Sequence, residues 1–170
     1  MIPADQLLPE SAQRVAALLR AMGHPTSIVM LPETGKTSAE AAAGLGCRVA
    51  EIAKSIVFRR LSDNAAVMVV ASGINRVDEQ KVAAIVGALG KANAKFVKEK
   101  IGYAIGGVCP IGHLKKTVML VDQDLMQYPA VWAAAGHPHA VFQLTPAQLQ
   151  TMTGAPVADI AQLIEMKELA

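Results

Sequence analysis

The sequence predicts an α+β domain in which helices flank a mixed, mostly antiparallel sheet. Apolar runs rich in β-branched residues occur as neighbouring pairs, such as SIVFRRL with AAVMVVAS, rather than alternating strictly with helices. Segments with apolar residues at helical spacing separate these pairs. Neither a repeat nor a long linker divides the 170 residues, so we expect residues 1–170 to form a single domain.

The first half of the chain shows helix and strand signals in turn. The expected elements are a helix at 11–23, a strand at 26–31, a helix from Thr37 or Ser38 to Gly44 or Gly46, a short helix at 48–54, and strands at 55–61 and 65–72. Ser11 is the expected cap of the first helix, and Gly23 closes it. Glu40 after Thr37 or Ser38 completes a helix start signal. The residues SDNA predict a turn between the two strands.

The second half continues with helices and short strands. The expected elements are a helix at 77–90, short helices at 95–102 and 123–126, a strand at 117–122, strands at 130–136 and 140–144, a helix at 145–152 and a closing helix at 157–168. Asp78 is the expected cap of the first of these, and Gly87 or Gly90 its end. Thr145, followed by proline at the first helical position, predicts another helix start.

Composition narrows the class of protein and its partners. No apolar run approaches the roughly 20 residues of a membrane span, and the first residues lack a secretion signal, so no membrane partner is expected. Two cysteines are too few for a disulfide framework and indicate a reduced, cytoplasmic protein. The net charge of +2 is by itself too small to indicate a nucleic-acid-binding protein, and no DNA partner is expected. Basic clusters at Arg59–Arg60, Lys91–Lys100 and Lys115–Lys116 are typical of a solvated face, although a weak phosphate contact also fits.

The loop YAIGGVCPIGH, at residues 103–113, concentrates glycine, proline, cysteine and histidine. Its glycines match neither the dinucleotide-binding spacing nor the P-loop spacing. The consecutive Gly106 and Gly107 allow backbone N–H groups to converge on one oxygen atom, as in an oxyanion or phosphate site. A plain glycine turn explains the same residues, so both interpretations stay open.

Cys109 and His113 lie in the same loop and suggest two further kinds of site. They could form a nucleophilic pair, but the partners of such pairs usually come from distant segments. A zinc site would need two more ligands, for which His137 and His139 are the available residues. Nothing else supports a metal, so we expect neither a metal nor a cofactor, and we expect Cys109 to be a small residue of the loop.

Two further segments place polar residues at strand ends. Lys54 stands beside an apolar strand, where its ammonium is costly to bury unless it contacts an anionic or oxygen partner. The alternative is a lysine whose ammonium extends to water at the strand end. In ASGINRVDEQK the strand ends at Ser72, turns at Gly73 and is followed by Asn75 and Arg76. Asp78 as a helix cap explains part of this segment, but polar side chains at a strand end can also bind a polar ligand.

Three motifs, KS at residues 54–55, SGINRVD and GYAIGGVCPIG, occur here in one order and at one spacing. Together they resemble the YbaK/prolyl-tRNA-synthetase-associated editing domain family. The resemblance covers nearly the whole chain, from the first helix to TGAPVADI. The invariant lysine of the family corresponds to Lys54, its G-x-x-x-P motif to Gly106 and Pro110, and the glycine of its late strand–strand segment to Gly136.

The resemblance implies a compact domain with a curved, barrel-like sheet and a trans-editing activity. Members of the family hydrolyse the ester between a wrong amino acid and the 3′-terminal adenosine of a tRNA, often a proline tRNA, and some lie inside prolyl-tRNA synthetase. This chain is therefore expected to be a free-standing aminoacyl-tRNA deacylase, a monomer or a weak homodimer. Its expected partners are the aminoacyl-tRNA 3′ end and prolyl-tRNA synthetase. A small amino acid such as Ala, Ser, Cys or Thr would fit the implied pocket.

The resemblance also implies roles for particular residues. Lys54 would position the substrate through phosphate or ribose oxygens, and the N–H groups around Gly106 and Gly107 would hold the oxyanion. The expected substrate-binding residues are Ser72, Gly73, Asn75, Arg76, Tyr103, Cys109, Pro110, Gly112, His113 and Gly136. Asn75 stands where many relatives have an acidic residue, and Cys109 where serine or another small residue is common. These differences bear on which substrate is chosen more than on the reaction class. Two alternatives are a non-catalytic module that binds tRNA or a synthetase, and a cysteine hydrolase that uses Cys109 and His113.

Overall fold

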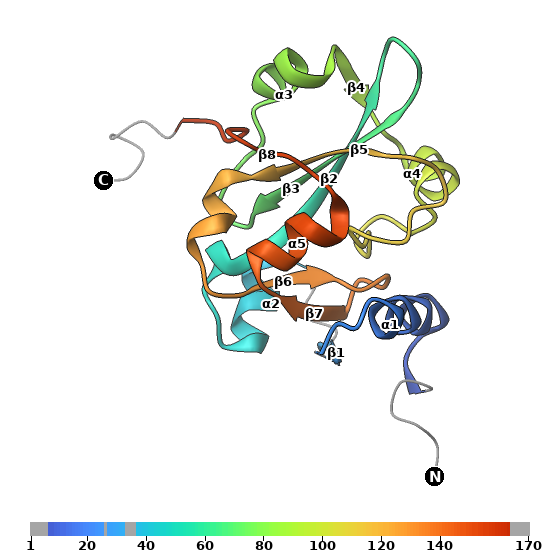
Figure 1. The fold of residues 1–170 in the computed structure, drawn as a ribbon, viewed down its shortest axis with the longest axis vertical. Helices are drawn as coiled ribbons and strands as arrows, with labels where there is room; N and C mark the ends of the chain where they lie inside the picture. The colour runs from blue at the N-terminus through green and yellow to red at the C-terminus, as the bar shows by residue number, and fades with distance from the viewer. Residues whose placement is uncertain (1–6, 26, 33–36, 164–170) are drawn as a thin grey trace.

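A computed structural model describes residues 7–25, 27–32 and 37–163, and Figure 1 shows their arrangement. The elements, in chain order, are α1 (Glu10–Ala21), β1 (Ile28–Met30), α2 (Ser38–Leu45), η2 (Val49–Glu51), β2 (Ile52–Arg60), β3 (Ala66–Ser72), α3 (Glu79–Val86), β4 (Leu89–Lys91), α4 (Ala94–Lys100), β5 (Val118–Asp122), η3 (Gln123–Gln127), β6 (Val131–Ala134), β7 (Ala140–Leu144), α5 (Pro146–Thr153) and β8 (Val157–Ala158). No helix in these ranges is long and apolar enough to cross a bilayer.

The strands form one mixed sheet in the order β1-β7-β6-β2-β3-β5-β8, and β4 pairs with β2 beside this path. Pairing is antiparallel between β1 and β7, β2 and β3, β2 and β4, and β6 and β7. It is parallel between β2 and β6, β3 and β5, and β5 and β8. The predicted α+β class with a mostly antiparallel mixed sheet is therefore confirmed. The sheet stays open, because its end strands β1 and β8 do not pair with each other among the described strands.

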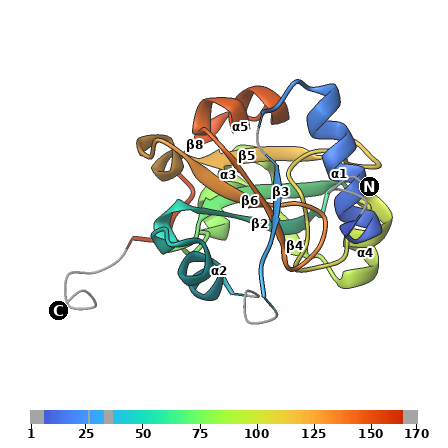
Figure 2. The same ribbon diagram turned by 90° about the horizontal axis from the view of Figure 1, so that it is seen from below.

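Helices cover both faces of the sheet, as Figure 2 shows for α5 and α2 on opposite sides. On one face, α1 and α5 bury Val15, Leu19 and Leu149 against Met68 and Phe142. On the other face, Val82 of α3 packs against β3, and the alanines of α2 pack near the start of β2. Every residue of β3 is buried, which explains why its sequence is a continuous apolar run rather than an alternating one.

Capping residues explain why most helices begin and end where the sequence predicts. The side chain of Thr37 accepts a hydrogen bond from the Glu40 N–H, and Asp78 accepts from the N–H groups of Gln80 and Lys81. Thr145 and Gln148 form a capping box at the start of α5. The first helix differs, because it begins at Glu10 after Pro9, so Ser11 lies inside it and is not its cap.

The helix predicted at 48–54 is wrong and one strand was missed, because strand pairing overrides local periodicity. The segment 48–54 contains only the short η2, and its last three residues, Ile52 to Lys54, begin β2, where they pair with β3 and β6. The strand β4, which the sequence did not indicate, pairs with the far end of β2. Both segments lie within the sheet because of partners distant in the sequence, which no local pattern reveals.

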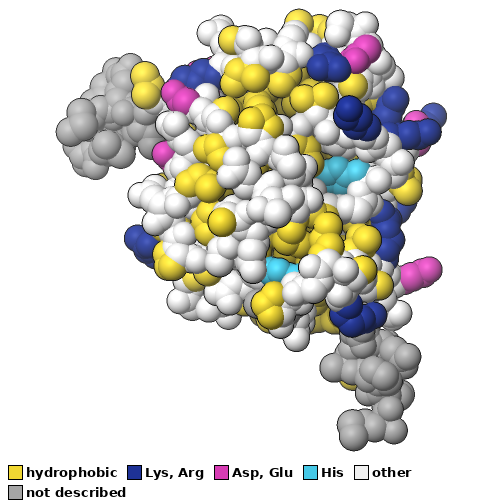
Figure 3. Space-filling model, viewed as in Figure 1, with side chains coloured by type: hydrophobic (Ala, Val, Ile, Leu, Met, Phe, Trp, Pro, Cys, Tyr) yellow, Lys and Arg dark blue, Asp and Glu magenta, His cyan; other side chains and the backbone are white. Residues whose placement is uncertain are grey.

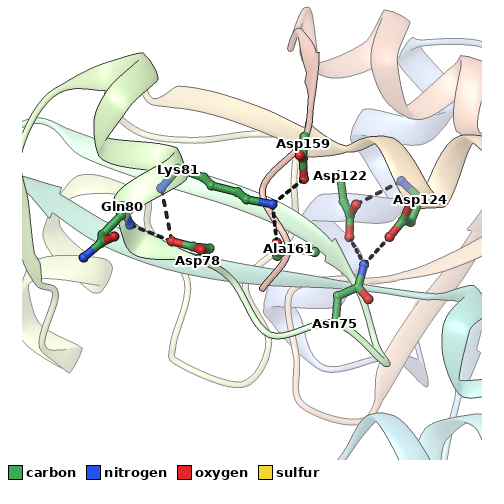
Figure 4. A network of polar contacts seen from close by, with 8 residues as sticks. All are labelled: Asn75, Asp78, Gln80, Lys81, Asp122, Asp124, Asp159 and Ala161. Carbon is green, nitrogen blue, oxygen red and sulfur yellow. Dashed lines mark hydrogen bonds and ion pairs between the residues drawn. The ribbon is translucent and has the colours of Figure 1, made fainter. Parts of the chain in front are cut away.

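The closing helix predicted at 157–168 is also wrong over its described residues. Here β8 pairs with β5, Val77 forms an isolated bridge with Ala161, and the Asp78 N–H donates to the Ile160 carbonyl. Figure 4 shows Lys81 holding the same segment, with its ammonium 3.0 Å from the Asp159 carboxylate and 2.8 Å from the Ala161 carbonyl oxygen. The remainder of that prediction, 164–168, lies outside the described residues.

Candidate active site in a gap of the sheet

A gap opens in the middle of the sheet beside β2. On the edge of β2 that faces away from β3, β6 pairs with β2 only at Ile52 and Ala53, and β4 pairs only from Phe58 onward. The Gly73 N–H donates to the Ile52 carbonyl, and the Arg60 N–H donates to the Ala65 carbonyl, so even-numbered residues of β2 turn their backbone groups toward β3. The backbone groups of Ser55 therefore face the gap. On this edge of β2, opposite β3, none of the described strands pairs with residues 54–57.

A cavity of about 200 Å³ lies at this gap. Its walls come from α2, from β2, from the predicted loop and from the segment around the β6–β7 turn. The lining residues are Thr37, Ser38, Ala41, Ile52, Ala53, Lys54, Ser55, Gly106, Val108, Trp132, Ala134, Pro138 and Val141. Two of the three residues predicted to be catalytic, Lys54 and Gly106, thus lie at one cavity although they are 52 positions apart in the sequence.

Lys54 carries the only charged side chain among the lining residues of this cavity. Its ammonium lies 3.4 Å from the Gly73 carbonyl oxygen, and no carboxylate within the described ranges forms an ion pair with it. Partial burial lowers the pKa of Lys54, the nearby Arg76 lowers it further, and Asp122 acts in the opposite direction. A cation that is partly desolvated and lacks a carboxylate partner can bind an anionic or carbonyl oxygen of a ligand.

Ser55 is a cavity residue to which the sequence analysis assigned no role. Its hydroxyl oxygen is buried and has no hydrogen-bond partner within the described part of the chain. A buried hydroxyl without a partner is unfavourable, and native proteins hold few of them. The sequence signal was present, since a serine interrupts the apolar strand directly after Lys54, but the signal alone could not show that the hydroxyl lacks a partner.

The first half of the loop, at residues 104–107, is a tight turn, and its N–H groups do not converge on one point as expected. The Gly107 N–H donates to the Ala104 carbonyl oxygen over 3.1 Å, and Gly106 has the positive φ of +96° that the turn requires. The N–H of Gly107 is therefore occupied within the turn, contrary to the expected oxyanion contact. Gly106 and Val108 line the cavity, and neither of their N–H groups donates to an acceptor in the described ranges.

Gly107 has a packing role instead. A β-carbon at this position would lie 2.7 Å from the backbone N, Cα and C atoms of His137. The turn therefore rests directly on the β6–β7 connection, whose Pro138 lines the cavity. Gly136, also expected at the site, faces α1, since its β-carbon would lie 2.6 Å from the Ser11 carbonyl oxygen. Gly136 thus fixes the connection to α1 and does not line the cavity.

The second half of the loop is anchored in the core. Cys109 is fully buried among core residues and is absent from the cavity lining, so it does not form the pocket wall that was expected. Burial raises the pKa of its thiol to about 12. His113 reaches the Cys109 carbonyl oxygen with Nε2 over 2.8 Å and Thr117 with Nδ1. A protonated, inaccessible thiol whose histidine contacts the backbone does not have the geometry of a nucleophilic pair.

The part of the loop that packs into the core also includes Tyr103, Pro110 and Gly112. None of these three residues lines the cavity. The Tyr103 hydroxyl donates to the Ile111 carbonyl oxygen over 2.8 Å. Arg14 of α1 lies over the Tyr103 ring, 4.8 Å from its centroid, and donates to the Gly112 carbonyl oxygen. A β-carbon at Gly112 would lie 2.8 Å from that tyrosine hydroxyl, which explains the glycine. These contacts hold residues 109–113 against α1 and so fix the position of the turn beside the cavity.

The turn after β3 is held by a second internal network (Figure 4). The Asn75 amide donates to Asp122 and Asp124 over 2.8 Å each, and the Asp122 carboxylate also accepts from the Ser72 N–H. The Ser72 hydroxyl donates to the Ala50 carbonyl oxygen. Ser72 and Asn75 are therefore satisfied by the protein itself. Their contribution is to position Gly73, whose carbonyl oxygen receives Lys54.

Arg76 and the two histidines of the β6–β7 connection complete the surroundings. Arg76 is exposed and close enough to influence the pKa of Lys54. His137 accepts a hydrogen bond from the His139 N–H, whereas the buried Nδ1 of His139 has no partner among the described residues. No group of three or more potential metal ligands lies together in the described ranges, so the zinc alternative finds no ligand set there.

Comparison with known proteins identifies the family. Residues 32–152 match the aminoacyl-tRNA editing domain. The uncharacterized protein YwhH of Bacillus subtilis (strain 168) is 31% identical over 127 residues, which are 74% of this chain and 80% of the relative. The crystal structure of a candidate trans-editing enzyme for prolyl-tRNA synthetase is 41% identical, with a TM-score of 0.86 over 92% of this chain and 99% of that one. A structure from a study of epitope grafting onto scaffold proteins is 38% identical, with the same TM-score over 92% and 100% of the two chains. This chain belongs to the aminoacyl-tRNA editing domain family.

Proposed function

We propose that this protein is a trans-editing deacylase that hydrolyses the ester of a mischarged small amino acid on a tRNA. The observation that carries the proposal is the cavity in the sheet gap. There Lys54 presents a cation that pairs with no carboxylate of the described residues, beside backbone and hydroxyl groups that have no described partner. Family membership gives the reaction class. The structural relative described as a candidate trans-editing enzyme for prolyl-tRNA synthetase favours a proline tRNA as the carrier.

The reaction asks little covalent chemistry of the protein, because an aminoacyl ester is already reactive. A water molecule attacks the carbonyl carbon and a tetrahedral oxyanion forms. Its collapse breaks the ester bond, and the proton lost by the water passes to the leaving ribose oxygen, which releases the amino acid and restores the tRNA hydroxyl. In the proposal, Lys54 binds a phosphate or ribose oxygen of the terminal adenosine and holds the ester in place. The N–H groups of Gly106 and Val108 donate to the oxyanion, a type of contact worth about 3 kcal/mol in well-studied hydrolases.

The size of the cavity favours a small amino acid. Its volume of about 200 Å³ must hold the aminoacyl group together with part of the ribose. Ala41, Ala53 and Ala134 keep the walls small and apolar, and β2 adds the polar side chains of Lys54 and Ser55. A synthetase pocket discriminates against a residue one methylene smaller by only about 1–3 kcal/mol, so a second site that accepts only small residues corrects the remaining errors.

The deciding experiment is a deacylation screen. Purified protein is mixed with proline tRNA carrying Ala, Ser, Cys, Thr or Pro, and the loss of ester is followed over time. We expect turnover of at least one small amino acid and little turnover of prolyl-tRNA. Binding of tRNA without turnover of any of these esters would instead support the non-catalytic binding module. The same screen with a chelator present tests the expectation that the reaction needs no metal.

A further inference from the structure

The charge of the chain is distributed unevenly along the sequence. Residues 91–116 contain six lysines and one glutamate, a formal charge of +5. The whole chain has a net charge of +2, so all other residues together carry −3. A modest total therefore conceals one strongly basic segment, and such a segment is the electrostatic signature of a surface for anions.

The fold places these lysines on α4 and on the two segments next to it. Lys91 ends β4, and α4 follows directly with Lys95, Lys98 and Lys100. The Lys115 N–H donates to the Lys100 carbonyl oxygen over 3.0 Å, and the Leu114 N–H donates to Ile101, so the turn that carries Lys115 and Lys116 is fastened to the end of α4. Figure 3 shows Lys and Arg side chains spread along the edge of the molecule where α4 lies in Figure 1. We call these six lysines the α4 surface.

Most ammonium groups of the α4 surface lack a carboxylate partner. Within the described ranges only Lys95 has one, Glu99 at 3.9 Å, and Lys100 lies 5.9 Å from the centre of the Phe96 ring. Three cations elsewhere in the described ranges, Arg48, Arg60 and Lys81, do pair with a carboxylate. Cations that the protein leaves uncompensated on one surface repel each other, and an external polyanion relieves that repulsion.

The α4 surface also lies close to the cavity. Gly106 of the cavity lining follows Lys100 by six positions, so their backbones lie within about 21 Å of each other. A tRNA ends in a short single strand that joins the acceptor duplex. With its terminal adenosine in the cavity, the duplex therefore comes within reach of α4 and of the Lys115–Lys116 turn.

We propose that the α4 surface binds the phosphates of the tRNA acceptor stem while the 3′ end occupies the cavity. This inference rests on the proposed function, because it takes the aminoacyl-tRNA as the substrate. Lysine is depleted from protein–protein interfaces, whereas it is a common contact of nucleic-acid phosphates. The composition of the surface therefore favours an RNA duplex over an acidic face of a synthetase, and phosphate contacts recognise the duplex independently of its sequence.

The first test measures binding without turnover. Uncharged proline tRNA is titrated with the wild type, with the double variant Lys98→Gln/Lys116→Gln, and with the control Arg48→Gln/Lys81→Gln, which removes two cations that have carboxylate partners. At about 0.1 M salt we expect the first double variant to lose roughly tenfold in affinity, about threefold per surface lysine. The slope of log Kd against log salt concentration should fall by about 1–2, whereas the control keeps both values near the wild type.

The second test separates this proposal from the proposed function. The rate is compared on a full aminoacyl-tRNA and on the aminoacyl ester of the terminal CCA trinucleotide, which has no duplex. We expect the α4 double variant to raise KM on the full tRNA only and to keep the wild-type rate on the trinucleotide. If the double variant changes KM by the same factor on both substrates, the α4 surface is not an RNA site. The same conclusion follows if the variant weakens only the binding of prolyl-tRNA synthetase. Absence of turnover on both substrates by the wild type would instead reject the deacylase.

Discussion

At the scale of single residues, the two candidates for chemistry in the sequence occupy opposite environments. Lys54 lines a cavity and has one weak contact to a backbone carbonyl, whereas Cys109 is fully buried in the core and away from that cavity. Burial disfavours the charged form of both, so the pKa of the lysine falls and the pKa of the thiol rises. The lysine remains able to bind an oxygen of the substrate, but a thiol with a pKa of about 12 is not a nucleophile at neutral pH.

Substitution of these two residues should therefore have unequal effects on catalysis. We expect Lys54→Ala to lower kcat/KM by roughly 10- to 150-fold, because a hydrogen bond to a charged group is worth about 1.5–3 kcal/mol. Cys109→Ala removes only buried volume, so it should lower the free energy of unfolding and change kcat/KM by less than about tenfold. Single-turnover deacylation and denaturant unfolding of both variants measure these effects. An inactive, folded Cys109→Ala beside a nearly normal Lys54→Ala would restore the cysteine mechanism.

Ser55 allows a test in which stability and activity change in opposite directions. Its buried hydroxyl has no partner in the described protein, so Ser55→Ala removes an unsatisfied group and should leave the free energy of unfolding unchanged or raise it by up to about 1 kcal/mol. If the hydroxyl rotates about χ1 to contact the aminoacyl group, kcat/KM should fall by about 5- to 20-fold. Ser72→Ala is the contrasting variant, because that hydroxyl donates to Ala50 and its loss should destabilise the fold. A destabilised Ser55→Ala with unchanged kcat/KM would make Ser55 a structural residue.

At the scale of elements, the turn at Ala104–Gly107 and the β6–β7 connection behave as one unit. A methyl group at Gly107 would lie 2.7 Å from three backbone atoms of His137, a contact that neither segment can relieve by a side-chain rotation. Because Gly106 and Pro138 belong to the same cavity lining, any shift of the two segments changes the distance between the loop amides and Lys54.

We therefore expect Gly107→Ala to reduce both stability and activity. Overpacking of this kind typically costs about 1–3 kcal/mol of unfolding free energy, and the displaced turn should lower kcat/KM by more than about tenfold. Gly44→Ala is the matched control, since its β-carbon meets only the Leu31 side chain at 3.4 Å and the residue lies within α2, where alanine is favoured. Denaturant unfolding and deacylation rates measure both effects. Normal kinetics in a folded Gly107→Ala would show that the turn does not position the catalytic groups.

The elements also show how far local sequence signals reach. Capping residues such as Thr37, Asp78 and Thr145 placed the helix starts correctly, because each cap is an interaction within four residues. The start of β2, the strand β4 and the extended segment at 157–163 were missed, because pairing with distant strands determines them. The gap beside β2 was not predictable for the same reason. The resemblance placed Lys54 and Gly106 at the site, but it also assigned Cys109 and Gly136, which the packing directs elsewhere.

At the scale of the whole molecule, the anchor of the loop should make folding stability depend on pH. His113 is mostly buried between the Cys109 carbonyl and Thr117, and Arg14 lies nearby. Burial is the largest influence and lowers the pKa of His113 below its ordinary value of 6.5, and Arg14 lowers it further, whereas the contact with the Cys109 carbonyl acts in the opposite direction. The unfolded chain therefore binds the proton more readily than the folded protein does.

The sign of the pH effect follows from this difference in proton binding. The contribution of His113 to stability is fully present above pH 6.5 and is lost as the pH falls from 6.5 toward the lower pKa of the folded state, by at most about 1.4 kcal/mol per pH unit. The variant His113→Gln keeps a polar group that can donate to the Cys109 carbonyl but does not titrate. Urea unfolding at pH 7.5 and pH 5.5 should show a smaller loss of unfolding free energy in this variant than in the wild type. Equal losses in the two proteins would show that the pKa of His113 does not differ between the folded and unfolded states.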